Sequence, residues 1–146
     1  MSEYRQQALI EAPVESIWEL VGNPQRHPEW WPRVIEVRGE RFRQDDEYVQ
    51  ITRGPVGQSE TRFLIDKVED LREIRMHCTM SGTYAHWLLT GAQGGTFLDV
   101  AFGAEPMGMS MRVFDATYGR IFYRRWLADS LAALRQAAQP RAAASA

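Results

Sequence analysis

Histidine is the residue type in this sequence best suited to proton transfer, because its side chain titrates near neutral pH. His27 lies just before a pair of tryptophans and is a candidate acid or base. His77 is followed directly by Cys78, the only cysteine in the sequence. Neighbouring side chains in a strand point to opposite faces, so these two residues do not form a nucleophile–base pair.

Three other motifs have simpler structural explanations. The acidic run at residues 45–47 predicts a solvated hairpin tip, because like charges avoid burial. The methionines of residues 107–111 have a spacing that suits Cu(I), but no cysteine or histidine is nearby, which favours packing. A strand pattern rather than a helix follows the glycine-rich residues 91–95, unlike in a phosphate-binding loop. The sequence therefore predicts no metal site and no cofactor.

The composition is that of one globular domain. The chain has 146 residues, of which 45% are hydrophobic and 25% are charged, and its formal net charge is −2. Nucleic-acid binding normally requires a basic surface, so we do not expect it. The sequence begins without a signal-peptide pattern and contains no apolar run long enough to span a membrane. With one cysteine and no internal disulfide, we expect a cytoplasmic protein.

Residues 10–32 predict the end of a strand followed by two short helices. The first helix has an apolar face formed by residues at helical spacing: Val14, Ile17, Trp18 and Val21. Pro13 suits the first position of this helix, where its missing N–H would be unpaired in any case. Asn23 and Pro24 suit the N-cap and first residue of the second helix, which ends in two adjacent tryptophans.

The middle of the sequence predicts seven strands, six of them after the short helices. Their expected ranges are residues 4–11, 34–38, 47–53, 59–68, 73–80, 84–90 and 96–103. Short turns join most of them, which is typical of an antiparallel meander. Residues 108–139 then predict a long helix with an apolar stripe formed by Leu127, Leu131, Leu134 and Ala138. We expect Pro140 to end this helix and residues 140–146 to form a disordered tail.

Four motifs recur in the order of a known superfamily. They are Ala-Pro-Val-Glu-Ser-Ile-Trp (residues 12–18), His-Pro-Glu-Trp-Trp-Pro (27–32), Gly-Gly-Thr (94–96) and Ser-Leu-Ala-Ala-Leu-Arg (130–135). The sequence thus resembles the START-like, or helix-grip, superfamily (SRPBCC), and within it the polyketide cyclase/dehydrase-like branch. The resemblance implies an α+β fold with a seven-stranded curved antiparallel sheet around a long C-terminal helix. Two short helices would separate strands one and two, and residues 1–139 would form a single START-like domain.

The resemblance also implies an internal apolar cavity, because the long helix does not fill the concave side of such a sheet. Strand alternation and the family pattern together select its expected lining: Trp31, Phe63, Ile65, Cys78, Met80, Trp87, Leu89, Phe102, Tyr118 and Phe122. The third strand leaves open whether Val49 and Ile51, or Tyr48 and Gln50, point inward.

Cyclases and dehydratases of this superfamily use polar side chains in the cavity to polarise a carbonyl group or move protons. By this resemblance Arg120, His27 and Lys67 are candidate catalytic residues. The other two histidines, His77 and His86, fall on the expected outer face of the sheet.

The predicted function is to bind one hydrophobic or aromatic small molecule, such as a lipid, a polyketide or a quinone-like compound, in the internal cavity. One alternative is an aromatase/cyclase or dehydratase-like enzyme that acts on a polyketide-type substrate. A second alternative is a partner-binding module that forms a homodimer through the long helix or a strand edge.

Overall fold

The computed structural model describes residues 2–54, 56–104 and 118–145 and contains one seven-stranded antiparallel sheet. The strand order is β1-β7-β6-β5-β4-β3-β2, so all neighbours except β1 and β7 are consecutive in the sequence. The strands are β1 (Ser2–Ile10), β2 (Val34–Arg38), β3 (Glu47–Arg53), β4 (Gln58–Glu69), β5 (Glu73–Cys78), β6 (Thr83–Ala92) and β7 (Gly95–Ala104). The predicted meander is confirmed, with strand ends that differ by at most two residues from those expected.

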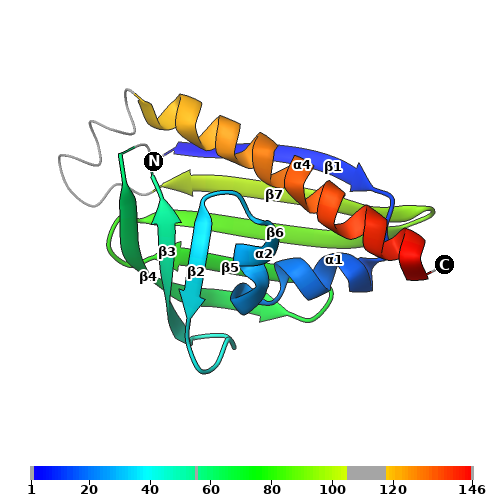
Figure 1. The fold of residues 1–146 in the computed structure, drawn as a ribbon, viewed down its shortest axis with the longest axis horizontal. Helices are drawn as coiled ribbons and strands as arrows, with labels where there is room; N and C mark the ends of the chain where they lie inside the picture. Colours follow the sequence, from blue (N-terminus) through cyan, green and yellow to red (C-terminus); the bar gives the residue numbers. More distant parts are fainter. Residues whose placement is uncertain (1, 55, 105–117, 146) are drawn as a thin grey trace.

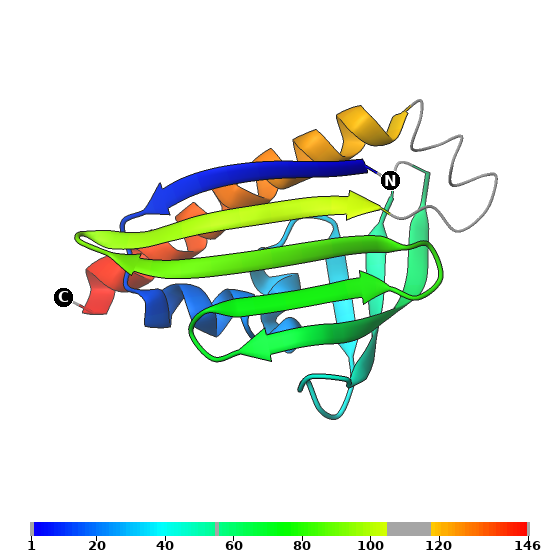
Figure 2. The ribbon, with the colours of Figure 1, turned by 180° about the vertical axis from the view of Figure 1, so that it is seen from behind.

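The helices within the described residues all lie on one face of this sheet. They are α1 (Val14–Val21), the 3-10 turn η1 (Pro24–Arg26), α2 (His27–Trp30) and α4 (Arg120–Ser145). In Figure 1, α4 crosses the sheet diagonally, and β2 and β3 run in a different direction from β1 and β7. Seen from behind in Figure 2, the strands stand in front of the helices. The sheet is therefore bent around α4, as the helix-grip fold requires.

The connection between the short helices differs in detail from the prediction. Pro13 is extended (φ −62°, ψ 152°) and occupies the N-cap of α1 instead of its first helical position. Asn23 precedes Pro24 at the N-cap of η1, as expected, but its side chain makes no capping bond there. The Asn23 Nδ2 atom donates instead to the carbonyl oxygen of Glu19, at 2.9 Å. This side chain thus satisfies a carbonyl near the C-terminal end of α1.

The apolar stripe of α4 is confirmed, because Leu127, Leu131, Leu134 and Ala138 are all buried. The prediction that Pro140 ends the helix is wrong, because α4 continues to Ser145. Proline removes one N–H from a helix, and most of the following residues are alanine, the residue with the highest helix propensity. The expected start of this helix at residue 108 and the methionines of residues 107–111 lie outside the described residues.

A β-bulge in β4 changes which side chains face inward. Ile65 pairs with Met76, but the next pair is Lys67 with Arg75, so two residues of β4 oppose one of β5. Simple alternation places Lys67 on the inner face, and this prediction is wrong. Lys67 lies on the outer face, where its Nζ atom is 3.1 Å from a carboxylate oxygen of Glu73.

Gly95 lies where β7 begins, in close contact with the end of β1. A Cβ atom added at Gly95 would overlap the backbone carbonyl oxygen of Ile10. We expect Gly95→Ala to lower the free energy of unfolding by about 1–3 kcal/mol, the usual cost of such overpacking. The control is Gly91→Ala at the end of β6, where an added Cβ meets no heavy atom within 4 Å, with an expected change below about 0.5 kcal/mol. Urea denaturation measures both variants, and equal unfolding midpoints would contradict the prediction.

Candidate functional site

A cavity of about 270 Å³ opens between the outer end of the β3–β4 hairpin, the β5–β6 turn and the first turns of α4. Its described lining consists of Gln50, Thr52, Gly54, Ser59, Thr61, Phe63, Cys78, Ser81, Thr83, Phe122, Tyr123 and Trp126. An apolar cavity of about 150 Å³ is enough to bind benzene. The space is therefore large enough for a ligand of one or two rings.

The chemical character of the wall changes with depth. The most buried lining residues are mainly apolar or aromatic, and they include Phe63, Cys78 and Trp126. The more exposed lining residues are mainly hydroxyl-bearing, namely Thr52, Ser59, Thr61, Ser81 and Thr83. A ligand in this cavity would bury its apolar part at the base and place polar atoms at the rim.

Gln50 is the polar exception at the base, with a relative exposure of only 2%. Its side-chain Nε2 atom donates to Thr52 Oγ1 at 2.8 Å, and its backbone carbonyl accepts from Thr61 Oγ1 at 3.0 Å. Its side-chain oxygen accepts no hydrogen bond from the described residues. Because Gln50 lines the cavity, this oxygen is available as an acceptor for a ligand O–H or N–H group.

A chain of hydroxyl groups forms the opposite wall. Ser81 Oγ donates to Thr83 Oγ1 at 3.1 Å, and Thr83 Oγ1 lies 2.9 Å from the hydroxyl of Tyr123 on α4. The Tyr123 ring is stacked on Tyr4 of β1, with ring centroids 6.2 Å apart. The Tyr123 hydroxyl is therefore held in place from two sides.

Contacting aromatic rings form the described core beside the cavity. Trp31 is stacked on Trp30 and on Trp126, with ring centroids 5.6 Å apart in each case, and meets Trp87 edge-on at 5.5 Å. Its indole N–H donates to Ser130 Oγ at 2.8 Å, which fixes α2 against α4. Phe102 of β7 contacts both Trp31 and Trp87. These rings pack together between α2, α4 and the strands β6 and β7.

Comparison with known proteins agrees with this geometry. A family model described as polyketide cyclase/dehydrase and lipid transport matches residues 1–139. The chain belongs to this family. No curated protein matches.

Solved structures of the polyketide cyclase-like fold superimpose well on this chain. The di-domain ARO/CYC protein StfQ from the steffimycin biosynthetic pathway matches with a TM-score of 0.75 and 19% identity over 97% of this chain and 51% of StfQ. The chain thus spans about half the length of StfQ. Protein BH1534 from Bacillus halodurans matches with a TM-score of 0.73 and 15% identity over 95% of this chain and 98% of that protein. Protein CV1439 from Chromobacterium violaceum matches with a TM-score of 0.73 and 16% identity over 96% of this chain and 99% of that protein.

The structure divides the expected cavity residues of this polyketide cyclase-family chain into three groups. Phe63, Cys78 and Phe122 line the cavity. Five others are buried in the core away from the described lining: Trp31, Ile65, Trp87, Leu89 and Phe102. The inward orientation expected for Met80 and Tyr118 is wrong, because their exposed fractions are 64% and 71%. Strand β5 ends at Cys78, so strand alternation no longer applies at Met80.

The expected lining omitted the polar residues of the cavity, although Gln50 was one of the open alternatives on the third strand. Tyr48 and Gln50 point inward, which settles the orientation of β3. The inner positions of the β3–β4 hairpin then continue as Gln50 and Thr52 opposite Thr61 and Ser59. This run of polar residues at inward positions was the signal that the space there is not part of the dry core.

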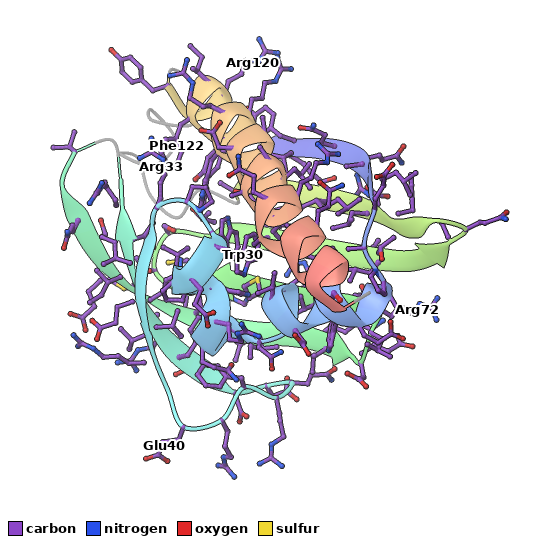
Figure 3. The ribbon with its side chains drawn as sticks, turned by 45° about the vertical axis from the view of Figure 1, so that its right-hand side comes forward. Trp30, Arg33, Glu40, Arg72, Arg120 and Phe122 are labelled. Carbon is purple, nitrogen blue, oxygen red and sulfur yellow. The ribbon has the colours of Figure 1, made fainter. Side chains whose placement is uncertain are left out.

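None of the three candidate catalytic residues lines the described part of the cavity. Arg120 is exposed at the start of α4, as Figure 3 shows, and Lys67 lies on the outer face beyond the bulge. His27 is fully buried beside Trp30 and Trp31. Its Nε2–H donates to the carbonyl oxygen of Val21 at 2.9 Å. Burial lowers the pKa of His27 to about 4, although the hydrogen bond to Val21 opposes this shift.

The outer face of the sheet carries the other histidines, as predicted. His77 contacts the Asp66 carboxylate at 2.8 Å, and His86 contacts Glu73 at 2.6 Å. Arg75 also pairs with Asp66. Within the described ranges, no group of three or more His, Cys, Asp or Glu residues is placed to hold a metal ion. None of the helices described there has the length and apolar character to cross a membrane.

The buried His27 predicts a pH dependence of stability. Its folded pKa is about 4 and the usual value is 6.5, so between these values the unfolded chain binds more protons. Stability is therefore lost as the pH falls below 6.5. Between pH 7 and pH 5 we expect a loss of about 2 kcal/mol from this residue.

The matched variant is His27→Gln, which keeps an N–H donor but does not titrate. Urea denaturation of both proteins at pH 7 and pH 5 isolates the contribution of His27, because all other titrating groups are common to the pair. Between pH 7 and pH 5 we expect a smaller loss of stability in His27→Gln than in the wild-type protein. Equal losses would show that folding does not lower the pKa of His27.

Proposed function

We propose that this chain binds one small aromatic or otherwise hydrophobic molecule that carries oxygen-containing groups. The observation that carries the proposal is the cavity of about 270 Å³ with an aromatic base and a hydroxyl-bearing rim. Removal of apolar ligand surface from water supplies affinity at about 25 cal/mol per Å², and the polar groups fix orientation. Gln50 and the Thr83–Tyr123 pair are the orienting groups.

The family description covers both polyketide cyclases and lipid transport, and the size of the cavity favours an aromatic polyketide-like or quinone-like guest over a long-chain lipid. The ARO/CYC protein StfQ shares this fold. The cavity volume suits one or two rings, whereas a long acyl chain would extend far beyond the described lining.

Binding is favoured over acid–base catalysis by the residues of the wall. The described lining contains hydroxyl groups, one carboxamide and one thiol, but no carboxylate, histidine, lysine or arginine side chain. General acid–base catalysis works best with groups whose pKa lies near the operating pH. The cyclase alternative is therefore a secondary prediction, and homodimer formation stays a separate prediction from the sequence.

A bulky substitution tests whether the cavity is the binding site. Thr61 lines the cavity from β4, and Arg62 is the next residue, pointing outward and exposed. We expect Thr61→Trp to fill the space and weaken binding of 2-naphthol at least tenfold, whereas Arg62→Trp leaves binding unchanged. Isothermal titration calorimetry measures both, with thermal melting to verify folding. Failure of the wild-type protein to bind 2-naphthol or related bicyclic probes would overturn the proposal.

Cys78 provides an independent reporter, because it is the only cysteine and lines the cavity although it is buried. A small thiol reagent such as methyl methanethiosulfonate must pass through the cavity to reach its Sγ atom. We expect labelling of the folded protein, followed by mass spectrometry, to slow severalfold when 2-naphthol is present. Thr61→Trp should slow labelling without any ligand. A labelling rate that neither change affects would place the guest elsewhere.

A further inference from the structure

Arg33 joins three parts of the cavity rim. Its guanidinium carbon lies 4.9 Å from the centre of the Phe122 ring on α4. Its Nη1 atom donates to the carbonyl oxygens of Arg53, at 3.2 Å, and Gly54, at 3.4 Å. Phe122 and Gly54 both belong to the cavity lining. Figure 3 shows Arg33 and Phe122 together near the N-terminal end of α4.

The charge of Arg33 is not neutralised by a carboxylate of the described chain. Other arginines are paired in this way, for example Arg26 with Glu29 and Arg75 with Asp66. Arg33 and Arg53 form no ion pair within the residues described, although the whole chain has a net charge of −2. Two unpaired cations therefore stand together on a chain that is otherwise slightly acidic.

The hydrogen bonds of Arg33 leave one edge of its guanidinium group without a partner. Nη1 is held by two backbone carbonyls, whereas Nε and Nη2 donate to no group in the described residues. The Nε–Nη2 edge of an arginine is a planar fork that matches the two oxygens of a carboxylate. Contact of the guanidinium with the Phe122 ring fixes the plane of this fork.

The backbone at Arg33 is held in an unusual conformation. Its φ angle is 74°, in the left-handed region that favours glycine. The Arg33 carbonyl oxygen accepts a 2.7 Å hydrogen bond from the N–H of Arg53, which ties the two arginines together. A surface recess of about 400 Å³ is lined by Arg33, Val34, Ile35 and Arg53. A strained backbone of this kind persists only where the surrounding structure holds it in place.

We propose that Arg33 binds the carboxylate of a ligand whose apolar ring system occupies the cavity, with Arg53 as a second positive charge nearby. This inference rests on the proposed function, because the ring of the same ligand occupies the cavity to which that function is assigned. It narrows the ligand class to aromatic or otherwise apolar carboxylic acids.

The test compares two ligands of nearly the same shape that differ in charge, 2-naphthoate and 2-naphthamide, by isothermal titration calorimetry at pH 7. We expect the wild-type protein to bind the carboxylate roughly tenfold more tightly, the usual effect of one charge-assisted hydrogen-bonded pair. Arg33→Gly should lose this preference and keep its affinity for the amide. Glycine accepts a φ of 74°, so this variant removes the side chain without new backbone strain.

Two further variants complete the comparison. Arg53→Gln should lower the preference for the carboxylate about threefold, because a second cation nearby adds less than the bidentate contact. Arg72→Gln is the matched control, since it removes the same charge on the opposite side of the molecule in Figure 3, where Arg72 pairs with Glu69. It should bind both ligands like the wild-type protein.

The outcomes separate this inference from the proposed function. Equal binding of the two ligands, or a carboxylate preference that persists in Arg33→Gly, would overturn the inference and leave the proposed function in place. Failure of both ligands to bind would overturn the two together. Tighter binding of 2-naphthyl phosphate than of 2-naphthoate would show that the rim selects phosphate esters, which contradicts the carboxylate assignment.

Discussion

The position of the cavity depends on the contact between Trp31 and α4. The Trp31 ring is stacked on Trp126, and its indole N–H donates to Ser130 on the same helix. The Trp126 indole N–H donates in return to the carbonyl oxygen of Pro32, at 2.7 Å. These two opposed hydrogen bonds and one stacked pair fix α2 to α4 and fill the concave face between them. The cavity is left on the side of Trp126 that faces the β3–β4 hairpin.

The sheet supplies the other wall because it bends strongly toward β2 and β3. In Figure 1 these strands turn away from the direction of β1 and β7, so the end of the β3–β4 hairpin stands opposite the first turns of α4. Tyr48 and Phe63 stack beside each other at the closed end, and Gln50 and Thr61 pair one step further out. Along the β3–β4 hairpin, the inward residues thus change from aromatic to polar as the hairpin enters the cavity.

The fold was predictable because it depends on local signals, whereas the site depends on how distant elements meet. Strand alternation correctly oriented Phe63 and Cys78, and helical spacing correctly identified the Leu127–Leu134 side of α4. It failed at Lys67, because a bulge is not visible in a binary pattern, and at Met80, because the strand ends two residues earlier. The family resemblance placed Trp31 beside open space, and strand alternation did the same for Trp87, because sequence does not show that four tryptophan rings pack together there.

The residues of the cavity wall also bear on whether this family member is a carrier or a catalyst. A carrier needs only an apolar base and orienting hydrogen bonds, both of which the described cavity contains. A ring-closing catalyst without an ionisable wall would act mainly by holding a flexible chain in a reactive conformation, an effect that reaches several kcal/mol in well-oriented systems. Such catalysis would depend on the depth and shape of the pocket. The polar groups best placed to polarise a carbonyl are then hydroxyls, above all that of Tyr123, which Thr83 and the ring of Tyr4 hold in one position. The two functions therefore require the same walls, and they differ in whether the guest leaves chemically changed.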